Sequence, residues 1–319
     1  MNLIDMHCDT ILLLMREEGL QLKQSPLCVD LKKMKRAGSM AQFFACFVYM
    51  KEFTGHDRFT KGYQHALRMM ERGKKEFADN ADMISLVTNY DELMRNYAMG
   101  KMSAFLTIEE GGILADDIKR LDHLYAEGIR MITLLWNGEN CIGYPNSRDV
   151  ALMQKGLKPF GVETVERMNE LGMIIDVSHL SDGGFWDVMR YSKKPVIASH
   201  SNARTLCSHP RNLTDDMIKA LANRGGVAGL NFYPAFLNGS AKSDIDDLIR
   251  HIEHMYHVGG EDFVAMGMDF DGFDDGVSCI ADIGQMDLLF DALKKRKFND
   301  SQIEKIWYKN ALRVIKEVL

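Results

Sequence analysis

The sequence predicts a single (β/α)8 barrel of the TIM type that spans residues 1–319, and three observations support this fold. Short apolar runs, typical of buried parallel strands, alternate with amphipathic segments along the chain. No low-complexity run, Pro-rich linker or change in composition divides it. Polar residues suited to catalysis follow several of the apolar runs, as they do at the carboxyl ends of barrel strands.

We expect eight strands, because eight segments are mostly continuous apolar runs: Asn2–His7, Ala41–Tyr49, Ser103–Ile108, Arg130–Leu135, Met173–Val177, Val196–Ser199, Val227–Asn231 and Val264–Met268. Between them, Val162, Val165, Met168 and Leu171 recur at helical spacing, and Gly172 follows as a stop signal. Similar helical patterns occupy Asp215–Asn223, Asp244–Val258 and Gln285–Lys295. A doubly wound sheet is the alternative fold, but no GxGxxG-like turn follows the first strand.

Composition argues against several classes of protein. The net charge is −6 and no dense Lys/Arg stretch occurs, so we expect no nucleic-acid partner. The six cysteines are scattered without a CxxC pair, which favours a reduced, intracellular chain over a disulfide framework. Neither end of the sequence reads as a signal peptide, a lipid anchor or a membrane span, so the cytoplasm is the expected location.

Histidines and acids gather after five of the expected strands. His7 and Asp9 end the first strand two residues apart, so both side chains can point the same way. The other strand ends carry Glu109-Glu110, Ser178-His179, Ser199-His200 and Asp269. A single such histidine is more often a hydrogen-bonded structural group, and a single such acid is usually a helix cap. Their coincidence on five strands predicts a site for catalytic zinc or a similar divalent ion, because the donors are nitrogen and oxygen without cysteine.

These motifs resemble those of the membrane dipeptidase (renal dipeptidase) family, which comprises zinc hydrolases on an amidohydrolase-like barrel. The similar stretches follow the family's order and span nearly the whole chain: Ile4–Asp9, Glu110–Gly112, Gly172–His179, Pro195–Ser201, Arg211–Leu213, Gly225–Val227 through Asn231–Tyr233, and Gly267–Gly272. Together they form a specific signal, whereas Glu-Gly-Gly alone would be weak.

The resemblance implies two zinc ions per chain, although other divalent ions also suit these ligands. It implies one zinc on His7 and Asp9, and a second on His179 and His200. Glu110 would bridge them in preference to Glu109, because the family's glutamate directly precedes the paired glycines.

The resemblance further implies that Arg211 receives the substrate carboxylate and that Tyr233 lines the pocket. Two adjacent cations acidify a shared water, and the bridging hydroxide that results attacks the peptide bond. Asp269 would act as the proton shuttle in this reaction. The segment after the fourth strand departs from the family, because Trp136 stands where mammalian members carry a histidine. Asn137 or Asn140 could supply the missing donor.

The leading hypothesis is therefore a zinc dipeptidase that cleaves small peptides with a free carboxyl terminus, and the resemblance implies tolerance of a D-residue there. The alternatives are a related amidohydrolase that acts on N-acyl amino acids, esters or lactones, and a barrel that binds ligands without turnover. A homodimer is expected by analogy with the family, and because homodimers are the most frequent oligomers of soluble proteins. The triplet His251, His254 and His257 is interpreted as packing or solvated rather than metal-binding.

Overall fold

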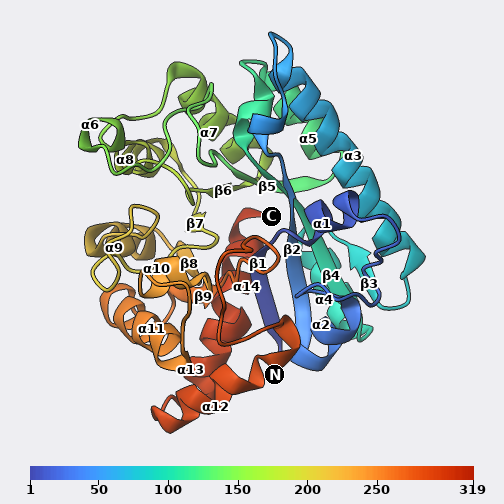
Figure 1. Cartoon of the computed structure of the whole chain (residues 1–319), viewed down its shortest axis with the longest axis vertical. Coiled ribbons are helices and arrows are strands. Elements are labelled where there is room, and N and C mark those ends of the chain that lie inside the picture. The colour runs from blue at the N-terminus through green and yellow to red at the C-terminus, as the bar shows by residue number, and fades with distance from the viewer.

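The computed structural model describes residues 1–319 and confirms the predicted barrel. Its strands all run parallel, in the order β2-β1-β9-β8-β7-β6-β5-β4, and the ring closes because β2 also pairs with β4. Helices surround these strands (Figure 1). The ring strands are β1 (Leu3–Cys8), β2 (Ser39–Phe47), β4 (Met102–Glu109), β5 (Ile129–Thr133), β6 (Ile174–Asp176), β7 (Val196–Ala198), β8 (Val227–Leu230) and β9 (Val264–Met266).

The sequence did not predict one further strand, β3 (Ile84–Leu86), which pairs only with β4 and lies outside the ring. Only Ile84 of its three residues is buried, so no apolar run marks it. All eight predicted ring strands are present. Several are shorter than predicted, because the chain leaves the ladder early to place polar residues at the barrel mouth.

The main helices follow the strands in alternation: α1 (Thr10–Arg16), α2 (Leu31–Ala37), α3 (Arg58–Asp79), α4 (Tyr90–Ala98), α5 (Ile118–Ala126), α6 (Val150–Met153), α7 (Pro159–Leu171), α8 (Asp182–Tyr191), α9 (Asp215–Asn223), α10 (Pro234–Leu237), α11 (Ile245–Gly259), α12 (Asp287–Lys295), α13 (Asp300–Glu304) and α14 (Asn310–Val318). Short turns of helix occupy Met50–Glu52 (η1), Gly111–Leu114 (η2), Ile283–Gln285 (η3) and Lys305–Lys309 (η4). As predicted, Gly172 ends α7 in the left-handed conformation, with φ of 70°. No helix is both long and apolar enough to cross a membrane.

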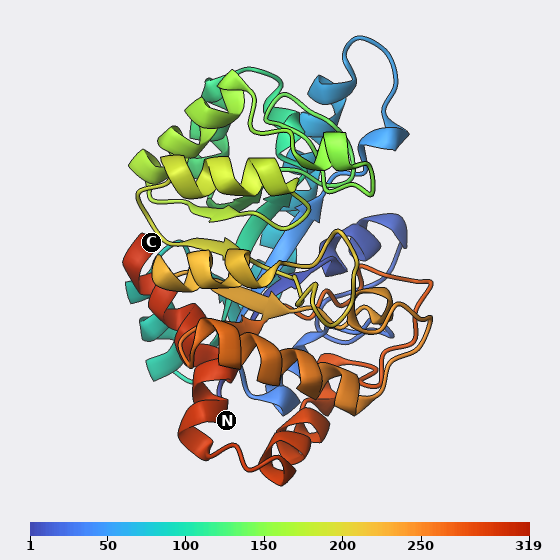
Figure 2. The same cartoon turned by 90° about the vertical axis from the view of Figure 1, so that its left-hand side faces the viewer.

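The hydrophobic core has two parts, and the smaller one explains which end of the barrel is open. Seventeen buried residues inside the barrel include Ile4, Phe43 and Phe105 together with Ala311, Val314 and Ile315 of α14. Helix α14 therefore closes the amino-terminal end of the barrel, away from the strand arrowheads (Figure 2). The carboxyl-terminal end is left to the loops, where barrel enzymes carry their active sites.

Candidate metal centre

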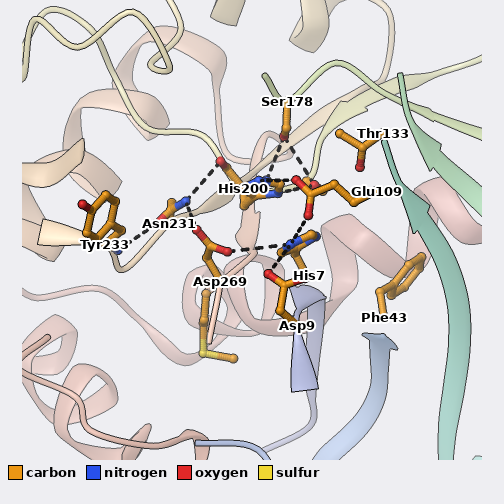
Figure 3. Close-up of polar contacts among 12 residues, drawn as sticks. His7, Asp9, Phe43, Glu109, Thr133, Ser178, His200, Asn231, Tyr233 and Asp269 are labelled. Atoms are coloured by element: carbon orange, nitrogen blue, oxygen red, sulfur yellow. Dashed lines mark hydrogen bonds and ion pairs between the residues drawn. The ribbon is translucent and has the colours of Figure 1, made fainter. Parts of the chain in front are cut away.

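Six polar side chains converge at the carboxyl-terminal mouth of the barrel: His7, Asp9, Glu109, His179, His200 and Asp269. They come from the ends of five strands, because His7 and Asp9 both belong to the end of β1. His7 lies on β1, Glu109 is the last residue of β4, and His200 follows β7. In Figure 3 the carboxylates of Asp9, Glu109 and Asp269 all point toward the His7 ring. Five of the six are residues that the sequence predicted for the site, and Glu109 takes the position expected for Glu110.

Glu109 lies at the middle of this group, and its two oxygens face different imidazoles. Oε2 is 3.3 Å from His7 Nε2, whereas Oε1 is 3.1 Å from His179 Nε2 and 3.7 Å from His200 Nε2. His7 Nε2 is in turn 3.4 Å from Asp9 Oδ2 and 3.7 Å from Asp269 Oδ1. The Glu109 carboxylate thus lies between two pairs of residues, His7 with Asp9 and His179 with His200.

The donors of this cluster fit a divalent metal. Both ring nitrogens of His7, Oδ1 of Asp9 and Oε1 of Glu109 are buried without a hydrogen-bond partner. Buried polar atoms rarely stay unpaired, because losing water without a replacement is costly. Two groups, His7–Glu109–His200 and His7–Asp9–Asp269, each hold three ligand atoms within 4.8 Å of one another. Nitrogen and oxygen ligands without sulfur suit catalytic zinc and related ions.

Gly272 keeps space open beside two of the carboxylates. A Cβ atom added at this position would collide with Oδ1 of Asp269 and Oδ2 of Asp9. Any other residue would push a side chain between the two groups that face His7. The glycine therefore preserves the volume in which an ion can approach both oxygens.

The structure places Glu110, which was expected to bridge the metals, outside the cluster of imidazoles. Strand β4 ends at Glu109, and Glu110 turns away with φ of 94°. Its carboxylate accepts hydrogen bonds from Gly112 N (2.8 Å), Trp136 N (3.2 Å) and Asn140 Nδ2 (2.6 Å). These three donors hold Glu110 away from the imidazole cluster. The expectation counted back from the paired glycines, whereas the end of the strand places Glu109 beside the imidazoles.

Glu110 and the glycines form a support for the loop that follows β5. A Cβ atom at Gly112 would meet Asn140 Cβ at 2.7 Å, and one at Gly111 would meet Leu134 O at 2.8 Å. The loop and the Glu-Gly-Gly turn therefore pack against each other at a distance that only glycine permits. The turn fixes the backbone of Trp136, which lines the mouth of the site.

Second-layer hydrogen bonds set the tautomer of His200. The Ser199 hydroxyl lies 2.6 Å from Asp176 Oδ2 and 2.7 Å from His200 Nδ1. A hydroxyl has one proton, and the carboxylate is the stronger acceptor, so Ser199 donates to Asp176 and accepts from His200 Nδ1–H. Nε2 of His200 then keeps a free lone pair directed at the cluster.

His179 is held in the same manner by a different group. Its Nδ1 lies 3.0 Å from Asn137 Oδ1, and its Nε2 lies 3.0 Å from His200 Nε2. Asn137 was expected to bind substrate, and its side chain does line the cavity, but its carbonyl oxygen is engaged by the imidazole. Both histidines therefore present Nε2 to the centre.

Burial and charge shift the pKa values of the cluster in opposite directions. Burial lowers the pKa of His179 and His200 well below the ordinary value, helped by the positive charges of Arg211 and His7. Burial alone would lower the pKa of His7, but Glu109 and Asp9 raise it well above normal. Burial also raises the pKa of Glu109 and Asp269. The pKa of His7 is therefore tied to those of Glu109 and Asp9, whose oxygens lie 3.3 and 3.4 Å from its Nε2.

Several residues at the mouth have backbones in the left-handed region, which costs free energy in residues other than glycine. His179 has φ of 69° and Asp269 has φ of 62°. Such conformations cost about 1–3 kcal/mol each and concentrate at functional sites. Here they turn the chain sharply at the strand ends, so that both side chains point into the cluster.

Asn231, which follows β8, fixes the orientation of Asp269. Its Nδ2 donates to Asp269 Oδ2 at 2.9 Å, which leaves Oδ1 directed at His7 (Figure 3). Its own Oδ1 accepts from Tyr233 N at 2.7 Å. The sequence assigned no role to Asn231, Ser199 or Asp176. Asp176 carried a usable signal, because an acid inside the apolar run Met173–Val177 must be buried and paired.

Arg211 is buried beside the cluster and keeps one donor free. Its Nη1 donates to Ser201 Oγ and its Nη2 to His200 O, each at 3.0 Å, whereas Nε has no partner. Burial lowers its pKa to about 10, so it remains charged at neutral pH. The Phe236 ring lies 5.3 Å from the guanidinium carbon, and both Phe236 and Tyr233 line the cavity.

A cavity of about 200 Å³ lies over the cluster, and Asp9, Glu109, His179 and Asp269 reach its surface. Tyr233 lines it as predicted and donates a hydrogen bond to Asp275 at 2.7 Å. Its ring also stacks on Phe273 at 5.1 Å. The loop after β9 is thereby tied over one side of the cavity.

The parallel barrel and the cluster of imidazoles and carboxylates at its mouth define a metal-dependent hydrolase. The family model described as membrane dipeptidase (peptidase family M19) matches residues 1–319. The chain belongs to this family and is a metallo-dipeptidase.

Individual proteins agree with this assignment. The chain is 32% identical over 297 residues to an uncharacterized dipeptidase of Schizosaccharomyces pombe, covering 90% of this chain and 71% of that one. Its structure matches that of the dipeptidase AC, a metallopeptidase of family M19, with a TM-score of 0.92 and 27% identity over 100% of this chain and 98% of that one. A metallopeptidase of Rhodobacter sphaeroides, liganded with a phosphinate mimic of the dipeptide L-Ala-D-Ala, gives a TM-score of 0.90 at 25% identity, covering 100% and 99%.

Proposed function

We propose that the chain is a zinc dipeptidase that hydrolyses dipeptides with a free carboxyl terminus, including those that end in a D-residue. The observation that carries the proposal is the position of Glu109 between two sets of donors, His7 with Asp9 and His179 with His200. These five residues would hold two divalent ions, with Glu109 shared between them. The structural similarity to a metallopeptidase liganded with a mimic of L-Ala-D-Ala supports the D-residue.

When bound, the ions would supply an acidified water and positive charge at the scissile carbonyl. The remaining chemistry belongs to the side chains. Asp269 Oδ1 faces the cluster, while Asn231 holds Oδ2, so one oxygen is free to take a proton from the nucleophile and pass it to the leaving amine. Tyr233 and Phe236 restrict access to this side of the cavity.

Arg211 would bind the substrate carboxylate. Its charge is buried and its Nε donor is unpaired, so an incoming carboxylate would satisfy both. A dipeptide also carries an ammonium group, which an N-acyl amino acid lacks. Asp274 is exposed at the edge of the cavity, and its carboxylate takes part in no hydrogen bond or ion pair. This free negative charge favours a dipeptide over an N-acyl amino acid.

The test combines metal analysis with a substrate panel. Purified protein loaded with zinc should contain two ions per chain and should hydrolyse L-Ala-L-Ala and L-Ala-D-Ala. N-acetyl amino acids, esters and lactones form the comparison set. Turnover of these compounds with no dipeptide turnover would replace the dipeptidase proposal with the amidohydrolase alternative. Zinc binding without any hydrolysis would indicate a binding protein.

A further inference from the structure

A second cavity, of about 430 Å³, adjoins the cavity over the metal centre. The two share Asp9, Phe47, Trp136, Gly272, Phe273 and Asp274. We call the second cavity the annex; its own wall consists of Leu12, Leu13 and Tyr49 together with the shared Phe47 and Trp136. The annex therefore lies directly beside the cavity in which a ligand of the metal centre would bind.

Aromatic rings form one wall of the annex. The Trp136 ring lies 5.0 Å from that of Phe47 and 5.4 Å from that of Tyr49, which it meets edge-on. Leu12 and Leu13 also line the annex, and they lie on α1, the helix that begins directly after Asp9. Seven of the twelve lining residues are hydrophobic. Such a surface favours an apolar group over water.

Two of the charged groups that line the annex, Arg16 and Asp271, already have partners. Arg16 pairs with Glu52 at 2.8 Å. Asp271 accepts hydrogen bonds from Thr10 Oγ1 and Cys28 N, both at 2.7 Å. Neither Arg16 nor Asp271 is free to bind a polar ligand, and the other two charged lining residues, Asp9 and Asp274, lie where the annex meets the metal-centre cavity. The part of the annex that is not shared therefore offers its occupant apolar contact.

The two ends of the metal-centre cavity differ, and this sets the direction of a bound peptide. Tyr233 and Phe236 line the end next to Arg211 but do not reach the annex. A dipeptide with its carboxylate at Arg211 and its scissile bond at the cluster must place its amino-terminal residue at the other end. That end is lined by Phe47 and Trp136, which also line the annex.

We infer that the annex binds the side chain of the substrate's amino-terminal residue, and that the enzyme prefers dipeptides that begin with a large aliphatic or aromatic residue. This inference rests on the proposed dipeptidase function. The annex has more than twice the volume of the metal-centre cavity, about 430 against about 200 Å³, so small side chains leave it unfilled. Filling an apolar pocket raises kcat/KM by about ten- to a hundredfold.

The first experiment measures kcat/KM for two matched series on the zinc-loaded protein. In Xaa-Ala, where Xaa is Gly, Ala, Leu or Phe, kcat/KM should rise at least about tenfold from Ala-Ala to Phe-Ala. In the reversed series Ala-Xaa, the same side chains should have a smaller effect. A flat Xaa-Ala series, or a stronger dependence in Ala-Xaa, would overturn the inference.

Substitutions in α1 test the annex itself. Leu13 is partly exposed, so Leu13→Gln removes apolar surface without adding charge, and Leu13→Trp fills the space. Both should lower the ratio of kcat/KM for Phe-Ala to that for Ala-Ala toward one. The matched control is Leu288→Gln, at an exposed leucine of α12, which should leave the ratio unchanged. An unchanged ratio in both Leu13 variants would contradict the assignment.

Binding gives a readout that does not depend on turnover. Analogues of Phe-Ala and Ala-Ala, in which a methylene-amine replaces the peptide bond, are titrated calorimetrically. The Phe analogue should bind at least about tenfold more tightly to the wild type and lose this advantage in Leu13→Gln. Failure to hydrolyse any dipeptide would reject the proposed function together with this inference. Hydrolysis without dependence on the first residue would reject the annex alone.

Discussion

The hydroxyl of Ser199 lies 2.7 Å from Nδ1 of His200. Because the same hydroxyl is 2.6 Å from Asp176, it donates to the carboxylate and accepts from the imidazole. Thr133 Oγ1 and the amides of Ser178 and Ser199 hold Asp176 in turn. A chain of buried hydrogen bonds therefore connects the barrel wall to the orientation of one imidazole at the metal centre.

Replacing Ser199 with alanine should weaken metal binding about 10- to 100-fold, because His200 loses the acceptor that keeps its proton on Nδ1. Competition with a chelator of known affinity measures the change, and nitrogen-15 NMR of the imidazole reports the tautomer. Ser39→Ala is the matched control, since the Ser39 hydroxyl is buried without a partner at the start of β2. Equal metal affinities for the two variants would refute this role.

Glu109 occupies the position that was expected for Glu110, and this leads to one prediction for each of the two residues. Glu109→Gln should lose zinc from both positions, because its two oxygens face both sets of imidazoles. Glu110→Gln should keep its zinc, but its free energy of unfolding should fall by about 1–3 kcal/mol. In this variant an amide nitrogen replaces one carboxylate oxygen, so it would face a backbone or amide N–H that the carboxylate accepted from. Metal content and thermal unfolding separate the two effects. Loss of zinc from Glu110→Gln alone would restore the original expectation.

The sequence predicted the barrel and most of the cluster because both follow from simple periodicities. Apolar runs place strands, and the parallel arrangement brings their carboxyl ends to one mouth. The two-residue spacing of His7 and Asp9 was enough to place both side chains in the cluster. These features require no knowledge of loop conformation.

Loop conformation decided what the sequence could not predict. Glu109 and Glu110 are chemically identical, and only the positive φ at Glu110 determines which one points inward. Asn137 was expected at the substrate, yet its carbonyl oxygen orients His179. The annex was also missed, because its walls come from β2, α1 and the loops after β5 and β9, which are adjacent only in the folded chain.

Arg211→Met should raise the KM for L-Ala-L-Ala about 10- to 100-fold, because a charge-assisted pair with the substrate carboxylate contributes about 1.5–3 kcal/mol. The comparison substrate is L-Ala-L-Ala amide, which has no carboxylate. Wild-type enzyme should discriminate against the amide, and the variant should treat the two compounds alike. Arg211 also contacts Ser201 and the His200 carbonyl, so an equal loss on both substrates would instead indicate a purely structural role.

His251 makes stability depend on pH at a point away from the metal centre. It is buried on α11, where Nδ1 accepts from Ala203 N at 3.1 Å and Nε2 donates to Leu237 O at 2.8 Å. Of the two roles predicted for it, packing or solvated, these contacts show the packing role. Burial lowers its pKa from 6.5 to about 4. The unfolded chain therefore takes up a proton on this residue at a higher pH than the folded chain does.

The stabilisation from His251 should be complete above pH 6.5 and should decline as pH falls toward 4, by at most about 3 kcal/mol. His251→Gln keeps a donor and an acceptor but cannot titrate, so its free energy of unfolding should fall less steeply over this range. Urea unfolding of metal-free protein between pH 4.5 and 7.5 measures both slopes. His257→Gln, at an exposed position of the same helix, should follow the wild type. If the His251→Gln curve also ran parallel to the wild type, the buried imidazole would have no part in acid sensitivity.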